Sequence, residues 1–250
     1  MTRLEPKLVE KPWGRTELPA MFGPTAGRRI GEVWFTGGGD DLPLLAKYIF
    51  TSEGLSIQVH PNDEQAHARG LAQGKSECWA ILDAEPGATL GLGLKQTVGK
   101  DDLRAAALDG TIERLMDWRP VAAGDFVFVP SGTVHAIGAG ISLLEFQQNS
   151  DVTYRLYDYG RPRELHLDDG LAVADPGPFA GEIRHLGDCD EARLVDGPHF
   201  RLVLARGDAF QDRRRWLMPL EGKSAGECVL LEPCESAPAS DGRTLVGATA

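Results

Sequence analysis

Short apolar segments separated by glycine and proline run along most of the chain. Runs of about four to eight residues bounded by turn residues are typical of β-strands, whereas helices need longer stretches with apolar residues three and four apart. The strands predicted in this way are Ile30–Phe35, Leu44–Phe50, Leu55–His60, Cys78–Asp83, Thr89–Leu94, Phe126–Val129, Ala136–Phe146 and Thr153–Tyr157. With 30 glycines and 16 prolines spread between them, the pattern predicts a mainly β domain.

Two stretches depart from the strand pattern and are predicted to be helical. Asp63–Ala72 follows a Pro-Asn turn. In Lys100–Trp118 the apolar residues recur largely at spacings of three and four, which places them on one face of a helix. Asp101 and Asp102 at its start suit the positive end of a helix dipole. We therefore expect one or two short helices beside the strands.

Strand signals weaken beyond about Asp175. Three segments still predict strands, namely Phe200–Ala205, Arg215–Leu220 and Glu227–Leu231. We expect residues 1–175 to form the main domain and residues 176–250 a smaller C-terminal β-unit packed on it. The tail from Ser236 is rich in alanine, serine and glycine, and it is expected to be loosely held.

Charge and composition narrow the classes of function. The 26 lysine and arginine residues face 37 aspartate and glutamate residues, for a formal net charge of −11. An acidic surface argues against broad binding to nucleic acid or to anionic membranes. A small phosphorylated substrate stays possible, because a few basic residues can gather in a pocket. The partner expected for the chain is therefore a small molecule, with no nucleic acid and no membrane, and the chain is expected to be a monomer or a homodimer.

The four cysteines and the N-terminal sequence predict a cytoplasmic location. Cys78, Cys189, Cys228 and Cys234 form no CxxC pair and no zinc-finger spacing, so they are interpreted as free thiols in a reducing compartment. The first residues lack the apolar core of a signal peptide. No apolar run approaches the roughly 20 residues that a membrane-spanning helix needs.

Two segments place histidines where a metal could be bound. In the segment from Gly54 to Pro61, Gln58 and His60 are two residues apart on a predicted strand, so their side chains point to the same face. In the segment from Gly124 to His135, an apolar strand ends at a Pro-Ser-Gly turn and a histidine enters the next strand. Either histidine alone is more simply explained as a core residue bonded to a backbone carbonyl.

The two segments together favour a metal site. Gly-x5-Pro-x-Gly-x2-His, ending at His135, is the second half of the cupin metal signature, and Gly54 to His60 resembles the first half with Gln-x-His in place of His-x-His. Glu77, which opens the strand after the first predicted helix, is the candidate carboxylate ligand. Mixed nitrogen and oxygen ligands with room for water suit a catalytic zinc, although iron or manganese would accept the same set.

The sequence resembles the type I mannose-6-phosphate isomerases (phosphomannose isomerases) in their short bacterial form. The resemblance covers residues 9 to about 175, through Val9-Glu-Lys-Pro-Trp-Gly14, Ile30-Gly-Glu-Val-Trp34, Leu55-Ser-Ile-Gln-Val-His-Pro61, Lys75-Ser-Glu77, Pro130-Ser-Gly-Thr-Val-His135 and Glu145 through Arg161. It implies an all-β fold, a cupin (jelly-roll) barrel with a second smaller β-unit. It also implies a metal-dependent isomerase that interconverts mannose 6-phosphate and fructose 6-phosphate, so that the small-molecule partner is a sugar phosphate.

The resemblance also implies roles for individual residues. One Zn²⁺ per chain would be held by Gln58, His60, Glu77 and His135. The catalytic residues implied are Arg155, Lys75, which matches a lysine implicated in proton handling, and Glu145, which matches a strand glutamate facing the same pocket. Ser56 and Lys47 fall near positions that hold the substrate phosphate, and Arg161 replaces a family lysine. For Lys47 and Arg161 a solvated surface charge is an equal alternative.

Two other kinds of function are compatible with parts of this pattern. A non-catalytic cupin that senses a sugar or sugar phosphate would need the metal site but not Arg155 and Lys75. An iron-dependent cupin dioxygenase would favour more histidines and has no need of the segment from Asn149 to Arg155. Only Lys100–Trp118 occupies the stretch where longer family members carry a helical domain, so the site is expected to be more open or completed by another subunit.

Overall fold

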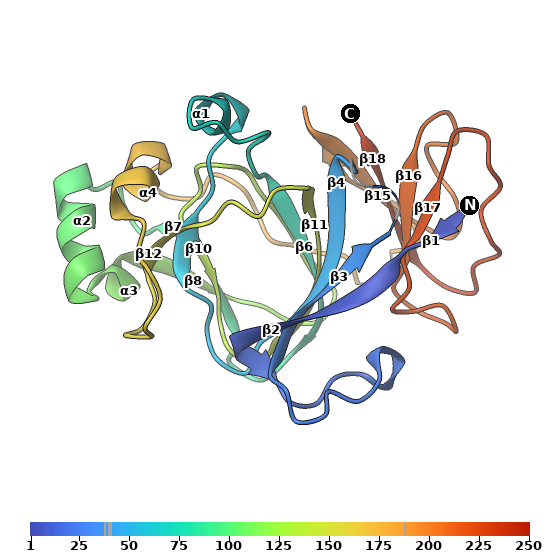
Figure 1. Ribbon diagram of the computed structural model, residues 1–250, viewed down its shortest axis with the longest axis horizontal. Helices are drawn as coiled ribbons and strands as arrows, with labels where there is room; N and C mark the ends of the chain where they lie inside the picture. Colours follow the sequence, from blue (N-terminus) through green and yellow to red (C-terminus); the bar gives the residue numbers. More distant parts are fainter. Residues whose placement is uncertain (38, 40–41, 188) are drawn as a thin grey trace.

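The computed structural model describes residues 1–37, 39, 42–187 and 189–250. These residues form three antiparallel sheets and a few short helices (Figure 1). Two sheets face each other as a barrel in the left and middle of Figure 1, and the third stands beside the barrel at the right. The arrangement confirms the predicted all-β barrel with a few short helices.

The barrel consists of a seven-stranded and a five-stranded sheet. The larger sheet has the order β13-β9-β6-β11-β4-β3-β2, with β2 (Glu5–Arg15), β3 (Ile30–Thr36), β4 (Leu44–Phe50), β6 (Glu77–Ala84), β9 (Asp125–Val129), β11 (Ile141–Gln148) and β13 (Arg184–His185). The smaller sheet has the order β12-β5-β10-β7-β8, with β5 (Ile57–Val59), β7 (Thr89–Leu94), β8 (Met116–Pro120), β10 (His135–Ile137) and β12 (Tyr154–Tyr157).

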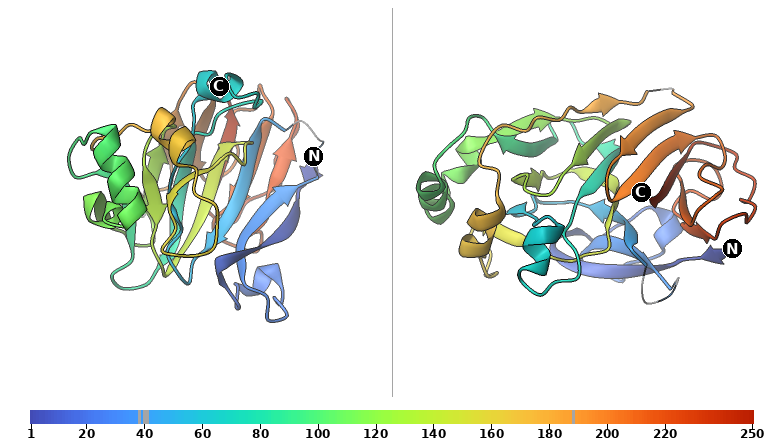
Figure 2. Two further views of the ribbon diagram at one scale, coloured as in Figure 1. Left: turned by 60° about the vertical axis from the view of Figure 1, so that its left-hand side comes forward. Right: turned by 90° about the horizontal axis from the view of Figure 1, so that it is seen from above.

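The third sheet combines C-terminal strands with the first strand of the chain. Its order is β1-β17-β16-β18-β15-β14, with β1 (Thr2–Arg3), β14 (Ala192–Asp196), β15 (Phe200–Ala205), β16 (Arg215–Pro219), β17 (Val229–Leu231) and β18 (Thr244–Thr249). Both termini therefore lie at the end of the molecule that this sheet occupies (Figures 1 and 2). The division of the chain at residue 175 stays a prediction.

Four α-helices and one 3-10 helix lie outside the sheets of the described residues. They are η1 (Ala20–Phe22), α1 (Asp63–His67), α2 (Lys100–Asp109), α3 (Ile112–Leu115) and α4 (Leu167–Val173). Helices α2, α3 and α4 cover the outer face of the five-stranded sheet, where Leu103 and Ile112 pack with Leu156 (Figures 1 and 2). No helix in the described part of the chain is long and apolar enough to cross a membrane.

The seven-stranded sheet is covered on both faces, and β4 shows the consequence for the sequence. All seven residues of β4 are buried. Ile49 packs inside the barrel, while Tyr48 and Phe50 pack in the core shared with the third sheet. Because side chains alternate between the faces of a strand, a strand covered on both faces reads as a continuous apolar run. Lys47, on the barrel face, is the exception in this run.

Several predicted elements match the structure, and others need correction. Leu44–Phe50, Thr89–Leu94 and Phe200–Ala205 have the predicted bounds. The predicted strand Ala136–Phe146 is wrong as one element, because a turn through Gly140, at φ 77°, separates β10 from β11. Positive φ costs glycine little, so the chain can reverse there.

The predicted helix Lys100–Trp118 is too long. Gly110 adopts a left-handed conformation at φ 82° and ends α2, and α3 follows as a single turn. The remaining residues form β8, which pairs with β7. The other predicted helix, Asp63–Ala72, ends at His67 in the structure.

The expectation of a loosely held tail is wrong for its last part. Strand β18 lies between β15 and β16 in the third sheet, with Leu245 and Val246 almost fully buried. A side chain at Gly247 would collide with the ring of Phe146, since a Cβ there would lie 2.4 Å from it. Small residues in the tail therefore allow the third sheet to pack closely on the barrel.

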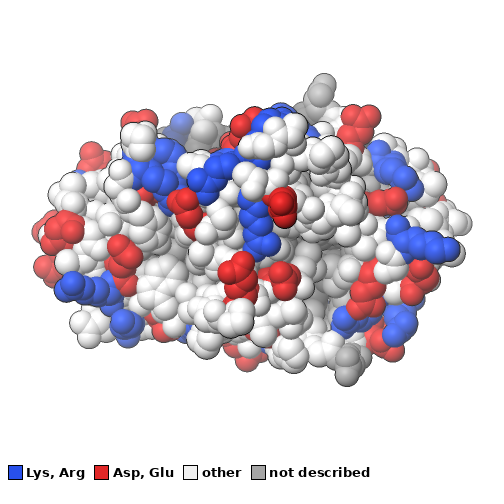
Figure 3. Space-filling view, turned by 90° about the horizontal axis from the view of Figure 1, so that it is seen from below, with Lys and Arg blue, Asp and Glu red and all other residues white. Residues whose placement is uncertain are grey.

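The surface carries both signs of charge. Figure 3 shows basic and acidic side chains interspersed over one face of the molecule. The net charge of −11 thus reflects more acidic than basic residues on a surface that carries both, and basic groups can still gather locally.

Candidate metal centre and active site

Three of the predicted site residues form a row across the five-stranded sheet. His135 on β10 pairs with Gln58 on β5, and Gln58 pairs in turn with Arg155 on β12. Directly opposed residues of neighbouring strands lie on the same face of a sheet. His60, two residues after Gln58, follows the end of β5 and is also buried. The structure therefore brings together residues that are up to 97 positions apart.

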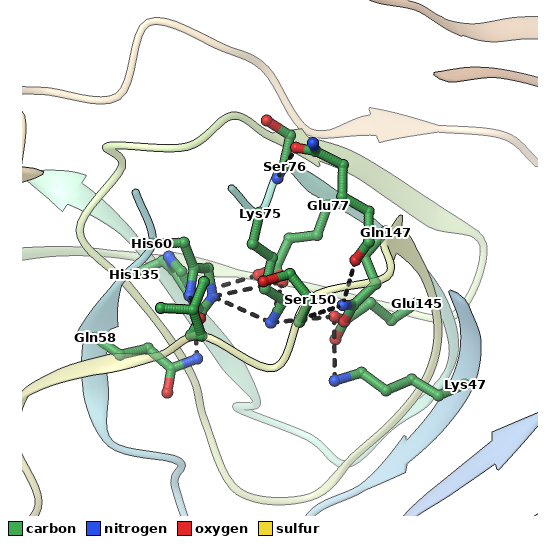
Figure 4. A network of polar contacts seen from close by, with 12 residues as sticks. Lys47, Gln58, His60, Lys75, Ser76, Glu77, His135, Glu145, Gln147 and Ser150 are labelled. Atoms are coloured by element: carbon green, nitrogen blue, oxygen red, sulfur yellow. Dashed lines mark hydrogen bonds and ion pairs between the residues drawn. The ribbon is translucent and has the colours of Figure 1, made fainter. Parts of the chain in front are cut away.

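The facing sheet supplies the charged groups opposite this row. Glu77 begins β6, Glu145 lies in the middle of β11, and Lys47 pairs with Glu145 from β4. Figure 4 shows these side chains and Lys75 pointing toward the two histidines inside the barrel. Glu77 and Glu145 are 1% and 2% exposed, so the carboxylates lie in the interior and need cations beside them.

His60, Glu77 and His135 converge in a way that fits a divalent metal. The Nε2 atom of His60 lies 3.5 Å from Glu77 Oε2, and that of His135 lies 3.2 Å from Glu77 Oε1. One ligand atom from each of the three residues lies within 4.8 Å of the others. Mixed imidazole and carboxylate ligation of this kind is typical of catalytic metal sites.

Backbone hydrogen bonds orient both histidines for ligation. His60 Nδ1 lies 2.8 Å from the carbonyl oxygen of Val152, and His135 Nδ1 lies 2.9 Å from that of Thr133. A proton on each Nδ1 can be donated to these carbonyls, which leaves each Nε2 lone pair free to face Glu77. Metal-binding histidines are commonly held by such a bond from the other ring nitrogen.

Burial and neighbouring charges set the protonation states that a metal requires. Burial and the nearby Lys75 ammonium lower the pKa of His60 to about 3, and burial also lowers the pKa of His135. Burial alone would raise the pKa of the Glu77 carboxyl, but the Lys75 ammonium beside it holds that pKa well below its usual range. Neutral imidazoles and an ionised carboxylate are the forms that bind metals.

Gln58 is the fourth predicted ligand, and Ser56 holds its amide. The Ser56 hydroxyl donates to Gln58 Oε1 at 3.0 Å, and Gln58 Nε2 lies 3.3 Å from His135 Nε2. Turning the amide by half a rotation would direct its oxygen toward the histidines, while the Ser56 hydroxyl could then accept from its nitrogen. The amide is therefore within reach of the metal position, with a partner in either orientation.

Alternating charges connect the metal position with the edge of the barrel. Lys75 Nζ lies 2.8 Å from Glu77 Oε2 and 3.6 Å from Glu145 Oε1. Lys47 Nζ lies 3.3 Å from the same Glu145 oxygen and 3.9 Å from Glu32 Oε2. Lys47 is 5% exposed, so the alternative of a solvated surface charge is wrong for this residue.

These side chains line a polar cavity of about 250 Å³. Of the predicted residues, it is lined by Lys47, Ser56, Gln58, Lys75, Glu77, Glu145 and Arg155. A larger cavity of about 790 Å³ lies where the barrel meets the third sheet and is lined by none of these seven residues. The chemistry is therefore concentrated in the smaller cavity.

The comparisons with known proteins place the chain in a family. No protein-family model matches the chain. The mannose-6-phosphate isomerase ManA of Bacillus subtilis (strain 168) is 46% identical over 212 residues, which cover 68% of this chain and 67% of ManA. The chain belongs to the mannose-6-phosphate isomerase family.

Solved structures of mannose-6-phosphate isomerases have the same fold. A crystal structure of the enzyme from Bacillus subtilis matches with a TM-score of 0.76 and 29% identity, over 99% of this chain and 96% of that one. A mannose 6-phosphate isomerase bound with zinc and yttrium matches with a TM-score of 0.66 at 15% identity, over 99% of this chain and 98% of that one. At the lower identity the likeness concerns the fold alone.

In the loop after β12, one arginine lines the polar cavity and another does not. Arg161, predicted to contact substrate, does not line the polar cavity, because its Nη2 donates to the Gly54 carbonyl at 2.6 Å and pairs with Asp158 at 2.9 Å. Arg163 lines the cavity instead. Its Nε and Nη2 donate to the two oxygens of Asp158 at 2.6 and 2.7 Å.

Other cavity residues were also missed at the level of sequence. Lys11, Glu32, Arg163 and His166 line the cavity, although none was assigned a role. The sequence did contain a signal for Glu32. It is the one charged residue in the otherwise apolar segment Ile30–Phe35, and a charge on a predicted buried strand indicates a functional position. Arg163 had no such signal, because Asp158 binds both arginines and the Gly54 carbonyl, distant in sequence, binds Arg161.

Proposed function

We propose that this chain is a metal-dependent aldose–ketose isomerase that interconverts mannose 6-phosphate and fructose 6-phosphate. One observation carries the proposal: Glu77 of the candidate metal triad lines the same polar cavity as the buried Lys75–Glu145 pair and Arg155. Membership of the mannose-6-phosphate isomerase family supports the same activity. The cytoplasmic location and the monomeric or dimeric state stay predictions from the sequence.

We further propose one zinc ion per chain, held by His60, Glu77 and His135 with Gln58 as the fourth ligand. Two imidazole nitrogens, a carboxylate and an amide oxygen would fill four positions, so water or substrate would take a fifth, an expansion that catalytic zinc accepts. The zinc in the solved family structure supports this choice. When bound, the metal would supply Lewis-acid stabilisation of negative charge that develops on the sugar oxygens.

The chain's own residues would move the proton. Isomerisation transfers a proton between C1 and C2 of the sugar through an enediolate. Lys75 and Glu145, whose charged atoms lie 3.6 Å apart in the cavity, are the pair proposed to exchange protons with the substrate. Arg155 would place a fixed positive charge beside the enediolate, since it lies directly across the sheet from Gln58.

Arg163 is proposed to face the phosphate end of the substrate, whereas Arg155 faces its reacting carbons. Each of the three lysines that line the cavity lies within 4 Å of a lining carboxylate: Lys11 of Glu32, Lys47 of Glu145 and Lys75 of Glu77. Within the described residues, neither arginine is paired with a carboxylate that lines the cavity. The bidentate bond to Asp158 fixes the guanidinium of Arg163 and leaves Nη1 available for phosphate.

Replacing Arg163 with glutamine is expected to weaken substrate binding more than turnover. A lost charge-assisted hydrogen bond is worth about 1.5–3 kcal/mol, so KM for mannose 6-phosphate should rise by roughly 10- to 100-fold with kcat little changed. Steady-state kinetics of Arg163→Gln would show this. The control is Arg161→Gln, which lies two residues away and outside the cavity, and its KM should change by less. Equal changes in both variants would contradict the assignment.

The function itself is tested by a coupled assay for fructose 6-phosphate formed from mannose 6-phosphate by the metal-loaded protein. We expect turnover that is lost when a chelator removes the metal. A protein that binds metal fully but does not turn over this substrate would refute the isomerase. A non-catalytic sugar sensor would also bind metal without turnover. The buried Lys75–Glu145 pair favours the enzyme, because a sensor does not need to transfer protons.

A further inference from the structure

The segment that carries Lys75 and Glu77 is fixed by side chains outside the cavity. Three consecutive amides each donate to a partner beyond the segment: Gly74 to Asp63 Oδ1 at 2.8 Å, Lys75 to the Pro61 carbonyl at 3.0 Å, and Ser76 to Gln148 Oε1 at 2.9 Å. Asp63 and Gln148 do not line the polar cavity. They therefore hold the backbone on both sides of Lys75 without reaching the place where substrate would bind.

Asp63 and Gln148 are also bonded to each other. Gln148 Nε2 donates to Asp63 Oδ1 at 2.9 Å, so this one oxygen accepts from Gly74 and from Gln148. The Gln148 amide thereby uses its nitrogen on Asp63 and its oxygen on Ser76, and its side chain is almost fully buried. We call this closed set of hydrogen bonds the Asp63–Gln148 clamp.

The clamp closes the loop between two of the candidate ligands. Residues 61–76 connect His60 to Glu77, and the base of the loop is tight, since a Cβ on Gly74 would lie 2.4 Å from the carbonyl carbon of Asn62. Asp63 lies inside this loop and bonds across its base. The position of Glu77 relative to His60 therefore depends on the clamp.

The third sheet also contacts the clamp. His199, between β14 and β15, places Nδ1 3.4 Å from Asp63 Oδ2. The two carboxylate oxygens of Asp63 thus have separate partners, Oδ1 within the clamp and Oδ2 at the third sheet. Through His199, the C-terminal part of the chain therefore contacts Asp63, which in turn holds the segment that carries Lys75.

We propose that Asp63 and Gln148 are positioning residues that set the place of the Lys75 ammonium and the Glu77 carboxylate, and that the required feature is the acceptor oxygen at Asp63 Oδ1 and not its charge. Misplacement of a catalytic group by about 1 Å can cost about a hundredfold in rate. Loss of a bond that orients a metal ligand typically costs about 10- to 100-fold in metal affinity or activity. The effect on turnover rests on the proposed isomerase function, whereas the effect on metal affinity does not.

The test compares Asp63→Leu with Asp63→Asn. Leucine fills a similar volume without an acceptor, so kcat at saturating metal should fall about 10- to 100-fold while KM for mannose 6-phosphate stays within about twofold. Asparagine keeps the acceptor oxygen and can turn its nitrogen toward His199, so it should retain at least about half of the wild-type kcat. Unchanged kcat in Asp63→Leu, or an equal loss in Asp63→Asn, would overturn the proposal.

A neighbouring residue controls for the stability of α1. Glu64 lies in the same acidic first turn as Asp63 and is exposed, so Glu64→Leu removes a similar favourable interaction with the helix dipole and leaves the clamp intact. It should keep wild-type kcat, and thermal unfolding of all variants shows that each is folded. Loss of kcat in Glu64→Leu equal to that in Asp63→Leu would overturn the clamp as the cause.

A second readout separates the clamp from the isomerase function. Zinc affinity of Asp63→Leu, measured by competition with a chromogenic chelator, should be about tenfold or more weaker than that of Asp63→Asn. This comparison holds even if the wild-type protein fails to isomerise mannose 6-phosphate, a result that would refute only the proposed function. Equal zinc affinities of the two variants in such an inactive protein would overturn the clamp.

Discussion

Replacing His135 with alanine is expected to abolish metal binding at stoichiometric zinc and to lower kcat/KM for mannose 6-phosphate by at least about a thousandfold. The imidazole is 1% exposed and lies 3.2 Å from Glu77 Oε1, and its loss leaves His60 and Glu77 as the remaining residues of the metal triad. A bound metal supplies several kcal/mol of charge stabilisation, and about 1.4 kcal/mol corresponds to a factor of ten in rate. Metal analysis and the coupled assay on the same preparation measure both effects.

The matched control for this prediction is His185→Ala. His185 pairs with Asp125 away from the polar cavity, and its side chain is 62% exposed. We expect this variant to keep full metal content and activity. If His135→Ala bound zinc as the wild type does, the site would have to be built from other residues.

Arg155→Ala is expected to lower kcat by about 100- to 1000-fold with the metal still bound. Loss of one preorganised group that stabilises developing negative charge typically costs about 3–4 kcal/mol. The guanidinium is held in place by a bond from Nε to the Glu164 carbonyl at 2.9 Å, and Arg155 is not a member of the metal triad. Kinetics at saturating zinc, with metal analysis beside them, separate this effect from loss of metal.

Arg104→Ala is a suitable control, because Arg104 lies on α2 outside the barrel and pairs with the exposed Asp168. Its kcat should equal that of the wild type. Full kcat in Arg155→Ala would remove the role assigned to that residue, although the metal site would be unaffected.

The meeting of the predicted metal ligands could be foreseen in part because strand geometry is local. Residues two apart on a strand share a face, so Gln58 and His60 had to point into one interior if the segment was a strand. A glycine–proline turn before His135 indicated that a second strand begins there. The pairing of His135 with Gln58 in the structure brings these two local patterns together.

The parts that could not be predicted depend on contacts distant in sequence. A spacing of six residues from Arg155 pointed to Arg161, but the chain turns at Tyr159, which has φ 54°, and Asp158 gathers both Arg161 and Arg163. The Gly54 carbonyl, which precedes β5, accepts a hydrogen bond from Arg161 and holds this arginine away from the cavity. Arg163 is therefore the one that lines the cavity. No local pattern encodes that choice.

The same limit explains the C-terminal tail. Alanine, serine and glycine have low strand propensity and small side chains, so a segment rich in them predicts neither a strand nor a buried core. In β18 they are needed because the third sheet lies close against Phe146 of the barrel, where Gly247 leaves room for the ring. Small residues can thus mark a tightly packed strand as well as a flexible one.

The most direct test of the central claim is a zinc titration of chelator-treated protein followed by the coupled isomerase assay. If His60, Glu77 and His135 hold one catalytic metal, activity toward mannose 6-phosphate should rise from near zero and reach its plateau at one zinc per chain, with no rise in His135→Ala. Undiminished activity in protein shown to be free of metal, or a plateau reached only at two zinc ions per chain, would contradict the account.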